Sequence, residues 1–263
     1  MNPREARELL QKQKEEEVKD LVKISNSLVE GFVSKSNAVA LKMLFYIAKQ
    51  QYKKNEWDIV EFTLSADDFA KYCNLDHRII KDNIKTMRST SVTFVERDNK
   101  GRITVEEGIV IVPRSRYDYT TKTIEITMFK KILDLILEVE ERFTTIDVKN
   151  VMELESKYSI RMAMILEQIF GFKGNPENWD VQQQKKFSLD DLNDLFGTKY
   201  KNFTDFERKV LKPTKEEMDD KSEISFSYVI NKGYNSPLDR GRPKALSVTI
   251  KLVQNKLRQR RLF

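Results

Sequence analysis

One segment of the chain combines side chains that can hydrogen-bond to DNA bases with an apolar side that would hold it on a protein surface. Between residues 197 and 215 there are six basic and two acidic residues, and apolar residues recur there at helical spacing. This pattern predicts an amphipathic helix over 202–219. Its apolar positions are Phe203, Phe206, Val210 and Leu211, and its polar positions are Lys201, Asn202, Thr204, Asp205, Arg208, Lys209 and Lys212.

The polar face of this helix suits the recognition of base edges in a major groove. Arg208 is the candidate for a bidentate contact to guanine, and Asn202 and Asp205 are candidates for adenine or cytosine. The alternative is an ordinary solvated helix whose lysines serve solubility.

A second predicted helix, over 77–88, carries a plainer basic stripe. Its bases are three, four or seven residues apart, and only Asp82 opposes them. Such a stripe contacts phosphates well and carries little sequence information, although a solvated face would look the same. The four bases are Arg78, Lys81, Lys85 and Arg88.

Two basic loops lie between predicted strands, at 97–102 and 233–244. A basic hairpin tip beside a recognition helix is a wing, which can follow the DNA backbone or enter the minor groove. The bases that we expect to contribute are Lys100, Arg102, Arg240, Arg242 and Lys244.

The sequence contains no recognisable catalytic group. His77 is the single histidine and Cys73 the single cysteine, so a metal site of several His or Cys ligands and an internal disulfide are both excluded. No GxxxxGK[ST] loop is present. We therefore expect no enzyme activity, no metal and no cofactor. His77 fits a surface position at a helix start, or a phosphate contact, and Cys73 fits a small core residue.

The composition is that of a globular protein with a modest positive charge. The 263 residues are 40% apolar and 33% charged, with a net charge of +6, which allows one large or two ordinary domains. No apolar run has the length of a membrane span, and residues 1–23 are charged without a signal-peptide core. We expect a cytoplasmic protein with no membrane partner.

The elements that would position the basic groups follow the order of a winged helix. Ser65 and Asp76 are predicted N-caps of two short helices, and a hairpin follows them. Residues 3–22 are expected to form a charged helix, and residues 24–33 a short strand or turn. The further elements predicted are helix 36–51, strand 58–64, helices 66–72 and 77–88, strands 91–96, 103–112 and 122–127, and helix 128–139.

The same order then returns about 120 residues later. Ser34-Lys35 corresponds to Ser156-Lys157, and the run Phe62–Asp67 corresponds to Phe187–Asp191. The helix over 202–219 and a hairpin follow. Chance similarity of two short motifs is the alternative, but the order of elements agrees as well.

These observations predict an α+β chain with two tandem winged-helix domains related by internal duplication. The expected divisions are an N-terminal charged helix at 1–23, a first domain at 24–140 and a second domain at 141–263. The junction is expected near 138–150, where acidic residues cluster without glycine or proline. We therefore expect a helical or tightly packed junction rather than a flexible linker.

Several runs carry a family resemblance that covers roughly residues 25–253. They resemble the second winged helix of Rep_3-type plasmid replication initiators. The resemblance is more specific in the second half of the chain than in the first, where it rests mainly on the order of elements. The runs are Ser156–Arg161, then Tyr200, Phe203, Phe206, Arg208, Val210, Leu211 and Pro213, and finally Gly241-Arg242 with Ser247–Ile250.

This resemblance implies binding to iterons, the short direct repeats at a plasmid origin. The second domain would read sequence, and the first would contact the backbone of the next groove and form a homodimer interface. Such proteins initiate as monomers, repress their own promoter as dimers, open the origin and recruit host replication proteins, a helicase or initiator. Arg161 keeps its place in the family pattern and is expected to reach a phosphate. The departures are a longer loop at 234–239 and Ala163-Met164 in place of bulkier residues.

Two other functions stay open from the sequence. A winged-helix transcription regulator without a replication role would bind DNA in the same way. A protein-interaction module would use the same fold without phosphate contacts, and its binding would depend less on salt.

Overall fold

The computed structural model describes most of the chain. The described residues are 21–31, 38–49, 59–88, 91–98, 103–137, 143–170, 184–234 and 242–255. Lys100, Arg102, Arg240, most of the predicted N-terminal helix and the side chain of Lys85 therefore lie outside what can be placed.

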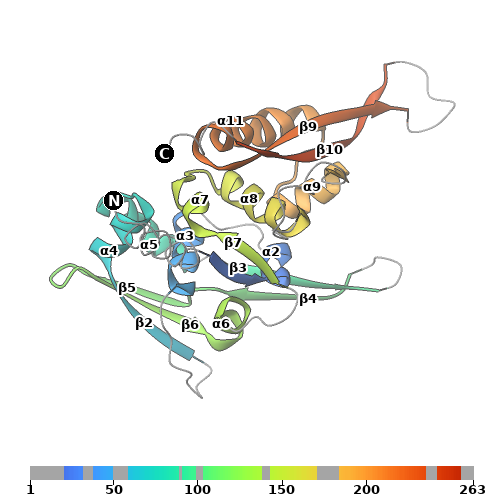
Figure 1. The fold of residues 1–263 in the computed structure, drawn as a ribbon. Helices are drawn as coiled ribbons and strands as arrows, with labels where there is room; N and C mark the ends of the chain where they lie inside the picture. The colour runs from blue at the N-terminus through green and yellow to red at the C-terminus, as the bar shows by residue number, and fades with distance from the viewer. Residues whose placement is uncertain are drawn as a thin grey trace, which may run out of the picture.

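The first half contains a three-helix, three-stranded winged helix (Figure 1). Its sheet has the order β2-β6-β5, with all neighbouring strands antiparallel. The elements are α3 (Ala38–Ala48), β2 (Ile59–Ser65), α4 (Ala66–Cys73), α5 (His77–Met87), β5 (Arg114–Asp118) and β6 (Thr123–Phe129).

The second half repeats this topology. Its sheet has the order β8-β10-β9, so the third strand is again central. The elements are α8 (Lys157–Phe170), β8 (Gln184–Phe187), α9 (Leu189–Phe196), α10 (Phe203–Phe206), the π-helical turn η2 (Glu207–Leu211), α11 (Lys212–Lys221), β9 (Ile224–Gly233) and β10 (Lys244–Gln254). The prediction of an α+β chain with two tandem winged helices is confirmed.

The helices α4 and α9 show the repeat at the level of single residues. Each begins with a serine N-cap, Ser65 or Ser188, whose hydroxyl accepts the backbone N–H three residues later. Each ends nine residues after its cap at a left-handed residue, Asn74 (φ 49°) or Gly197 (φ 60°). Asparagine and glycine tolerate this conformation best, so both helices stop where the local sequence requires it.

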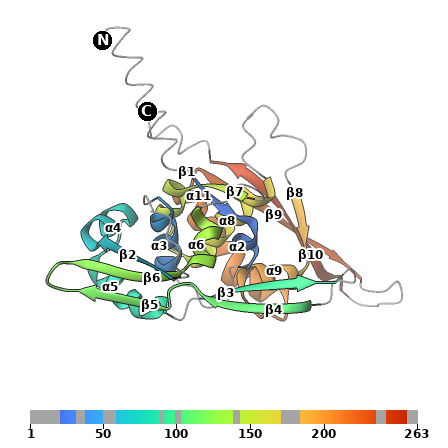
Figure 2. The same ribbon diagram turned by 90° about the horizontal axis from the view of Figure 1, so that it is seen from below.

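The hairpin that closes the first winged helix differs from the prediction. Among the described strands, β3 (Ser91–Arg97) and β4 (Ile103–Val110) pair only with each other, whereas β5 and β6 form the wing. The two hairpins extend to opposite sides of the molecule, as Figure 2 also shows. The sequence analysis missed β5 because a polar residue, Ser115, takes its buried position, where its hydroxyl donates to the carbonyl of Ile84 at 3.0 Å.

A two-stranded sheet joins distant parts of the chain beside these winged helices. β1 (Leu21–Ser25) pairs antiparallel with β7 (Phe143–Asp147), with Leu21 opposite Asp147. Leu21 and Val22 are thus strand residues, and the predicted helix over 3–22 is wrong at this end. The flanking helices are α2 (Asn26–Gly31), α6 (Lys130–Leu137) and α7 (Val148–Glu153).

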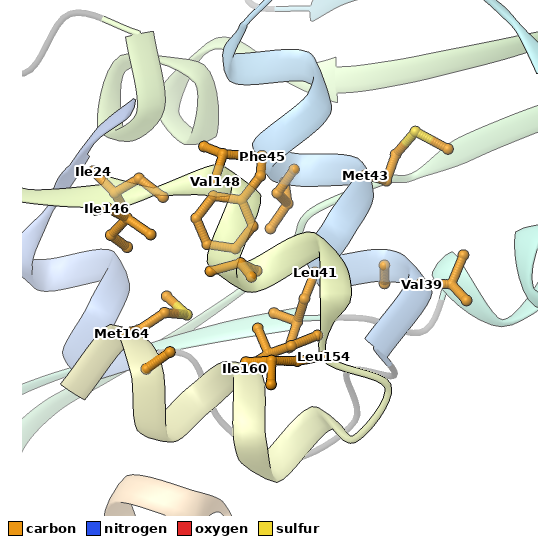
Figure 3. Packing of buried hydrophobic residues seen from close by; sticks show 14 of the residues in the cluster. Ile24, Val39, Leu41, Met43, Phe45, Ile146, Val148, Leu154, Ile160 and Met164 are labelled. Atoms are coloured by element: carbon orange, nitrogen blue, oxygen red, sulfur yellow. The ribbon is translucent and has the colours of Figure 1, made fainter. Parts of the chain in front are cut away.

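Helix α8 lies at the centre of the molecule. Every residue from Ser159 to Glu167 is buried, and the helix contacts α2, α3, α7, β7 and α11. Figure 3 shows Ile160 and Met164 of α8 in one cluster with Leu41 and Phe45 of α3. The two halves therefore share one hydrophobic core, which agrees with the expectation of a tightly packed junction.

One acid is enclosed in this core. Glu167 is 5% exposed, and burial, followed by the nearby Asp147 carboxylate, raises its pKa from 4.5 to about 8. A protonated Glu167 in the folded chain binds a proton that the unfolded chain releases above pH 4.5. Stability is therefore expected to fall as the pH rises from about 4.5 to about 8.

We predict that Glu167→Gln removes this part of the pH dependence, which amounts to at most about 1.4 kcal/mol per pH unit. Denaturant unfolding between pH 5 and 9 measures it, with the exposed Glu106→Gln as control. Parallel pH profiles for wild type and Glu167→Gln would contradict a protonated Glu167.

Candidate nucleic-acid interface

The helix predicted to read DNA is continuous from Phe203 to Lys221. The backbone stays in the right-handed helical region at both junctions, between α10 and η2 and between η2 and α11. We call residues 203–221 the reading helix. The residues on its buried side are Phe203, Phe206, Val210, Leu211, Thr214 and Met218.

The π turn within the reading helix follows from Pro213. Proline has no N–H to donate, and its ring would collide with the carbonyl of Lys209 in a regular α-helix. The preceding turn widens instead, and the N–H of Lys212 donates to Glu207, five residues back. This extra residue in the turn brings two consecutive residues, Val210 and Leu211, onto the buried side.

The three predicted base-reading residues form a chain of hydrogen bonds at the start of the helix. Asn202 is the N-cap: its Oδ1 accepts the N–H of Asp205 at 2.9 Å, and its Nδ2 donates to the Asp205 carboxylate at 3.0 Å. Arg208 Nη2 donates to the same carboxylate at 2.7 Å. The hydrogen bond from Asn202, with the charge of Arg208 adding to it, lowers the pKa of Asp205.

This chain orients the guanidinium and leaves it accessible. The Arg208 side chain is 70% exposed, and its remaining N–H groups are available for a second acceptor. Asn202 also has a structural role as the cap, which the sequence analysis did not assign. The other exposed residues on this side are Lys201, Thr204, Lys209 and Lys212, with Lys209 Nζ 5.6 Å from the Tyr200 ring centroid.

The far end of the reading helix is held by a carboxylate that the sequence analysis missed. Glu217 accepts the backbone N–H of Glu155 at 2.5 Å and of Ser156 at 3.2 Å, and the hydroxyl of Ser159 at 2.5 Å. These donors lie at the N-terminus of α8, where helical N–H groups lack partners. The Ser156–Ser159 part of the family motif therefore docks α8 on the reading helix. Nothing in the local sequence sets Glu217 apart from the neighbouring acidic residues, because its role depends on its position opposite the start of α8.

One lysine of the first half is buried. Lys42 of α3 is 2% exposed, its Nζ donates to the carbonyl of Cys73 at 3.3 Å, and burial lowers its pKa. The charges of Cys73, Glu155 and Glu217 act on this pKa in the opposite direction.

Cys73 lies in the core and His77 on the surface at the start of a helix, as predicted for both. Cys73 is fully buried, and burial raises its pKa to about 12. His77 begins α5 on the surface, with Nε2 3.0 Å from Asp67.

Arg161 is the clear correction among the predicted DNA contacts. It is buried on α8, and its Nε donates to the carbonyl of Leu195 near the C-terminus of α9 at 2.7 Å. The guanidinium satisfies a helix-end carbonyl that carries partial negative charge. The expectation that Arg161 reaches a phosphate is therefore wrong.

The basic stripe of the first half is partly structural. Arg78 and Lys81 are exposed on α5, which Asp76 caps by accepting the N–H of Arg78 at 2.6 Å. Arg88 instead donates to the carbonyl of Ser115 at 2.8 Å and ties α5 to β5. A smaller error concerns Ile79, which is 44% exposed although the periodicity assigned it to the buried face.

The wing of the second half carries its described bases at the surface. Arg242 and Lys244 are exposed where β10 begins, and Lys232 is exposed at the end of β9. Figure 1 shows β9 and β10 running beyond α9, away from the shared core.

The described residues contain neither a cluster of metal-binding side chains nor a membrane-spanning helix. No group of three or more His, Cys, Asp or Glu side chains among them could hold a metal ion. None of the described helices has the length and apolar character needed to cross a membrane.

Comparison with known proteins identifies two family models and similar folds. Residues 21–167 match the model "Initiator Replication protein, WH1", and residues 188–241 match "Initiator Rep protein, WH2". The crystal structure of Pi initiator protein in complex with iteron DNA matches with a TM-score of 0.66 and 16% identity, over 90% of this chain and 98% of that chain. At this low identity, the likeness shows a shared fold alone.

A structure of domains 2 and 3 of RctB matches more weakly, with a TM-score of 0.41 and 8% identity over 82% of this chain and 79% of that chain. No curated protein matches the sequence significantly.

We predict that Glu217→Ala lowers the free energy of unfolding by about 2–3 kcal/mol, because it leaves N–H donors at the start of α8 without their charged acceptor. The neighbouring Glu216→Ala is the matched control, since Glu216 is exposed and its loss should cost less than about 0.5 kcal/mol. Equal denaturant midpoints for the two variants would contradict this role of Glu217.

Proposed function

The chain belongs to the family of initiator replication proteins with two winged-helix domains, and from this premise we propose that it binds iteron repeats at a plasmid origin. The observation that carries the proposal is the reading helix, which exposes Arg208 beside Thr204, Lys209 and Lys212 while its other side is buried. The similar fold of an initiator protein seen in complex with iteron DNA supports it.

The two halves are proposed to have different tasks. Residues 141–263 read sequence through the reading helix in a major groove, and the wing contacts the neighbouring backbone. Residues 24–140 contact phosphates through α5, where Arg78 and Lys81 are exposed. The first half also provides a homodimer interface in this proposal.

The wider biological role follows the family premise. The protein acts in the cytoplasm, promotes opening of the origin and recruits a host helicase or initiator. As a dimer it represses its own promoter. These steps require binding rather than bond chemistry, and the proposal assigns no enzyme activity to the chain.

We predict that Arg208→Ala weakens binding to the preferred DNA sequence by about 1–3 kcal/mol and relaxes discrimination at one base pair. Fluorescence anisotropy with the preferred duplex and with single-base variants measures both. Arg116→Ala is the control. Arg116 is an exposed arginine of β5, away from the reading helix, and forms ion pairs with Asp118 and Glu125. If Arg116→Ala and Arg208→Ala weakened binding equally, the assignment of the reading face to Arg208 would be wrong.

A second prediction separates an initiator from a transcription regulator. The full chain should load stepwise onto tandem direct repeats, giving one additional gel-shift band for each repeat added to the duplex. The flanking DNA of the gene supplies the repeats, with scrambled repeats as control. Preference for a single palindrome over tandem repeats would favour a regulator.

A further inference from the structure

An apolar side chain lies exposed among cations at the base of the second wing. Leu246 is 40% exposed, and Tyr234, which follows the end of β9, is 50% exposed. Leu246 lies near the start of β10 and Tyr234 directly after β9, in the hairpin that Figure 1 shows extending beyond α9. The exposed bases around them are Lys232, Arg242 and Lys244.

The backbone gives Leu246 a defined direction. Ala245 pairs with Lys232 and Ser247 with Asn231, so Leu246 is the additional residue of a β-bulge. A Cβ on Gly233 would lie 2.8 Å from Cδ1 of Leu246, which shows that the leucine lies across the space that a glycine leaves open.

Hydrogen bonds stiffen the strands directly below the bulge. Nδ2 of Asn231 donates to the hydroxyls of Ser247 at 3.1 Å and Thr249 at 2.9 Å. These cross-strand bonds bind β9 to β10 on the same face of the hairpin. Leu246 is consequently presented on a rigid support rather than on a loose loop.

The charge around Leu246 indicates a polyanionic partner. The described residues 224–234 and 242–255 contain the bases Lys232, Arg242, Lys244 and Lys251 and no acid. An apolar protein groove would not require this excess of positive charge. In the minor groove of DNA, proteins combine the same two features, cations on the phosphates and an apolar side chain inserted at a base step.

We propose that Leu246 inserts at a base step in the minor groove next to the major groove that the reading helix enters. This inference rests on the proposed function and deepens it. Lys232 and Lys244 neutralise the flanking phosphates, and the leucine partly unstacks the step. The preferred sequence then includes an easily unstacked pyrimidine–purine step at a position that no polar side chain reads.

The experiment uses the full chain and the duplex that it selects from a random-sequence library, with 2-aminopurine replacing each adenine in turn. Wild type should raise the fluorescence of 2-aminopurine at one step, which reports unstacking. Leu246→Ser should abolish that increase and weaken binding roughly tenfold, with an unchanged slope of log K against log salt. Lys244→Ala should keep the fluorescence increase and reduce the slope by about 1.

Val229→Ser is the matched control, because Val229 is 63% exposed on the same hairpin and pairs with Thr249 away from the bulge. It should change neither signal. Unchanged fluorescence and affinity in Leu246→Ser would overturn the insertion alone. The insertion would also be overturned if Leu246→Ser abolished self-association and left DNA binding intact, because this surface would then be a protein interface. A wild-type chain that selects no sequence would overturn the proposed function as well.

Discussion

The carboxylate of Glu217 joins the reading helix to α8, the helix at the centre of the molecule. It accepts backbone N–H groups at the start of α8 and the hydroxyl of Ser159, and residues 159–167 of α8 are buried among elements of both halves. A short helix on a surface would have to be positioned by its apolar side alone. Here, charge-assisted hydrogen bonds at one end and buried aromatic residues at the other determine both its position and its direction.

Contacts within the protein divide the basic residues of this chain into two kinds. Arg161 is buried, and its Nε donates to the carbonyl of Leu195. Arg88 is exposed, but its guanidinium donates to the carbonyl of Ser115. Arg208 and Arg78 lie on helix faces that no other element covers, so they stay accessible to a ligand. The charge of a residue therefore indicates little about DNA binding until its surroundings are known.

The duplicated scaffold was predictable in part because its signals are local. The serine caps, the left-handed stops after nine residues and the apolar periodicity all lie within single elements. The first strand of each sheet pairs with a strand far along the chain, β2 with β6 and β8 with β10. The strand β5 buries Ser115 where a hydrophobic residue is usual. For the same reason the buried side of the reading helix could be predicted from Phe203 and Phe206, whereas the role of Glu217 could not.

The sequence by itself determined the winged-helix order, the apolar side of the reading helix and the excess of basic residues near it. Periodicity and capping act over a few residues, so they can be recognised without the fold. Only the tertiary structure decided which hairpin is the first wing, which arginines are internal and that both halves share one core. The buried arginine and the shared core depend on contacts between residues more than 30 positions apart, such as Arg161 with Leu195, and no local pattern encodes them.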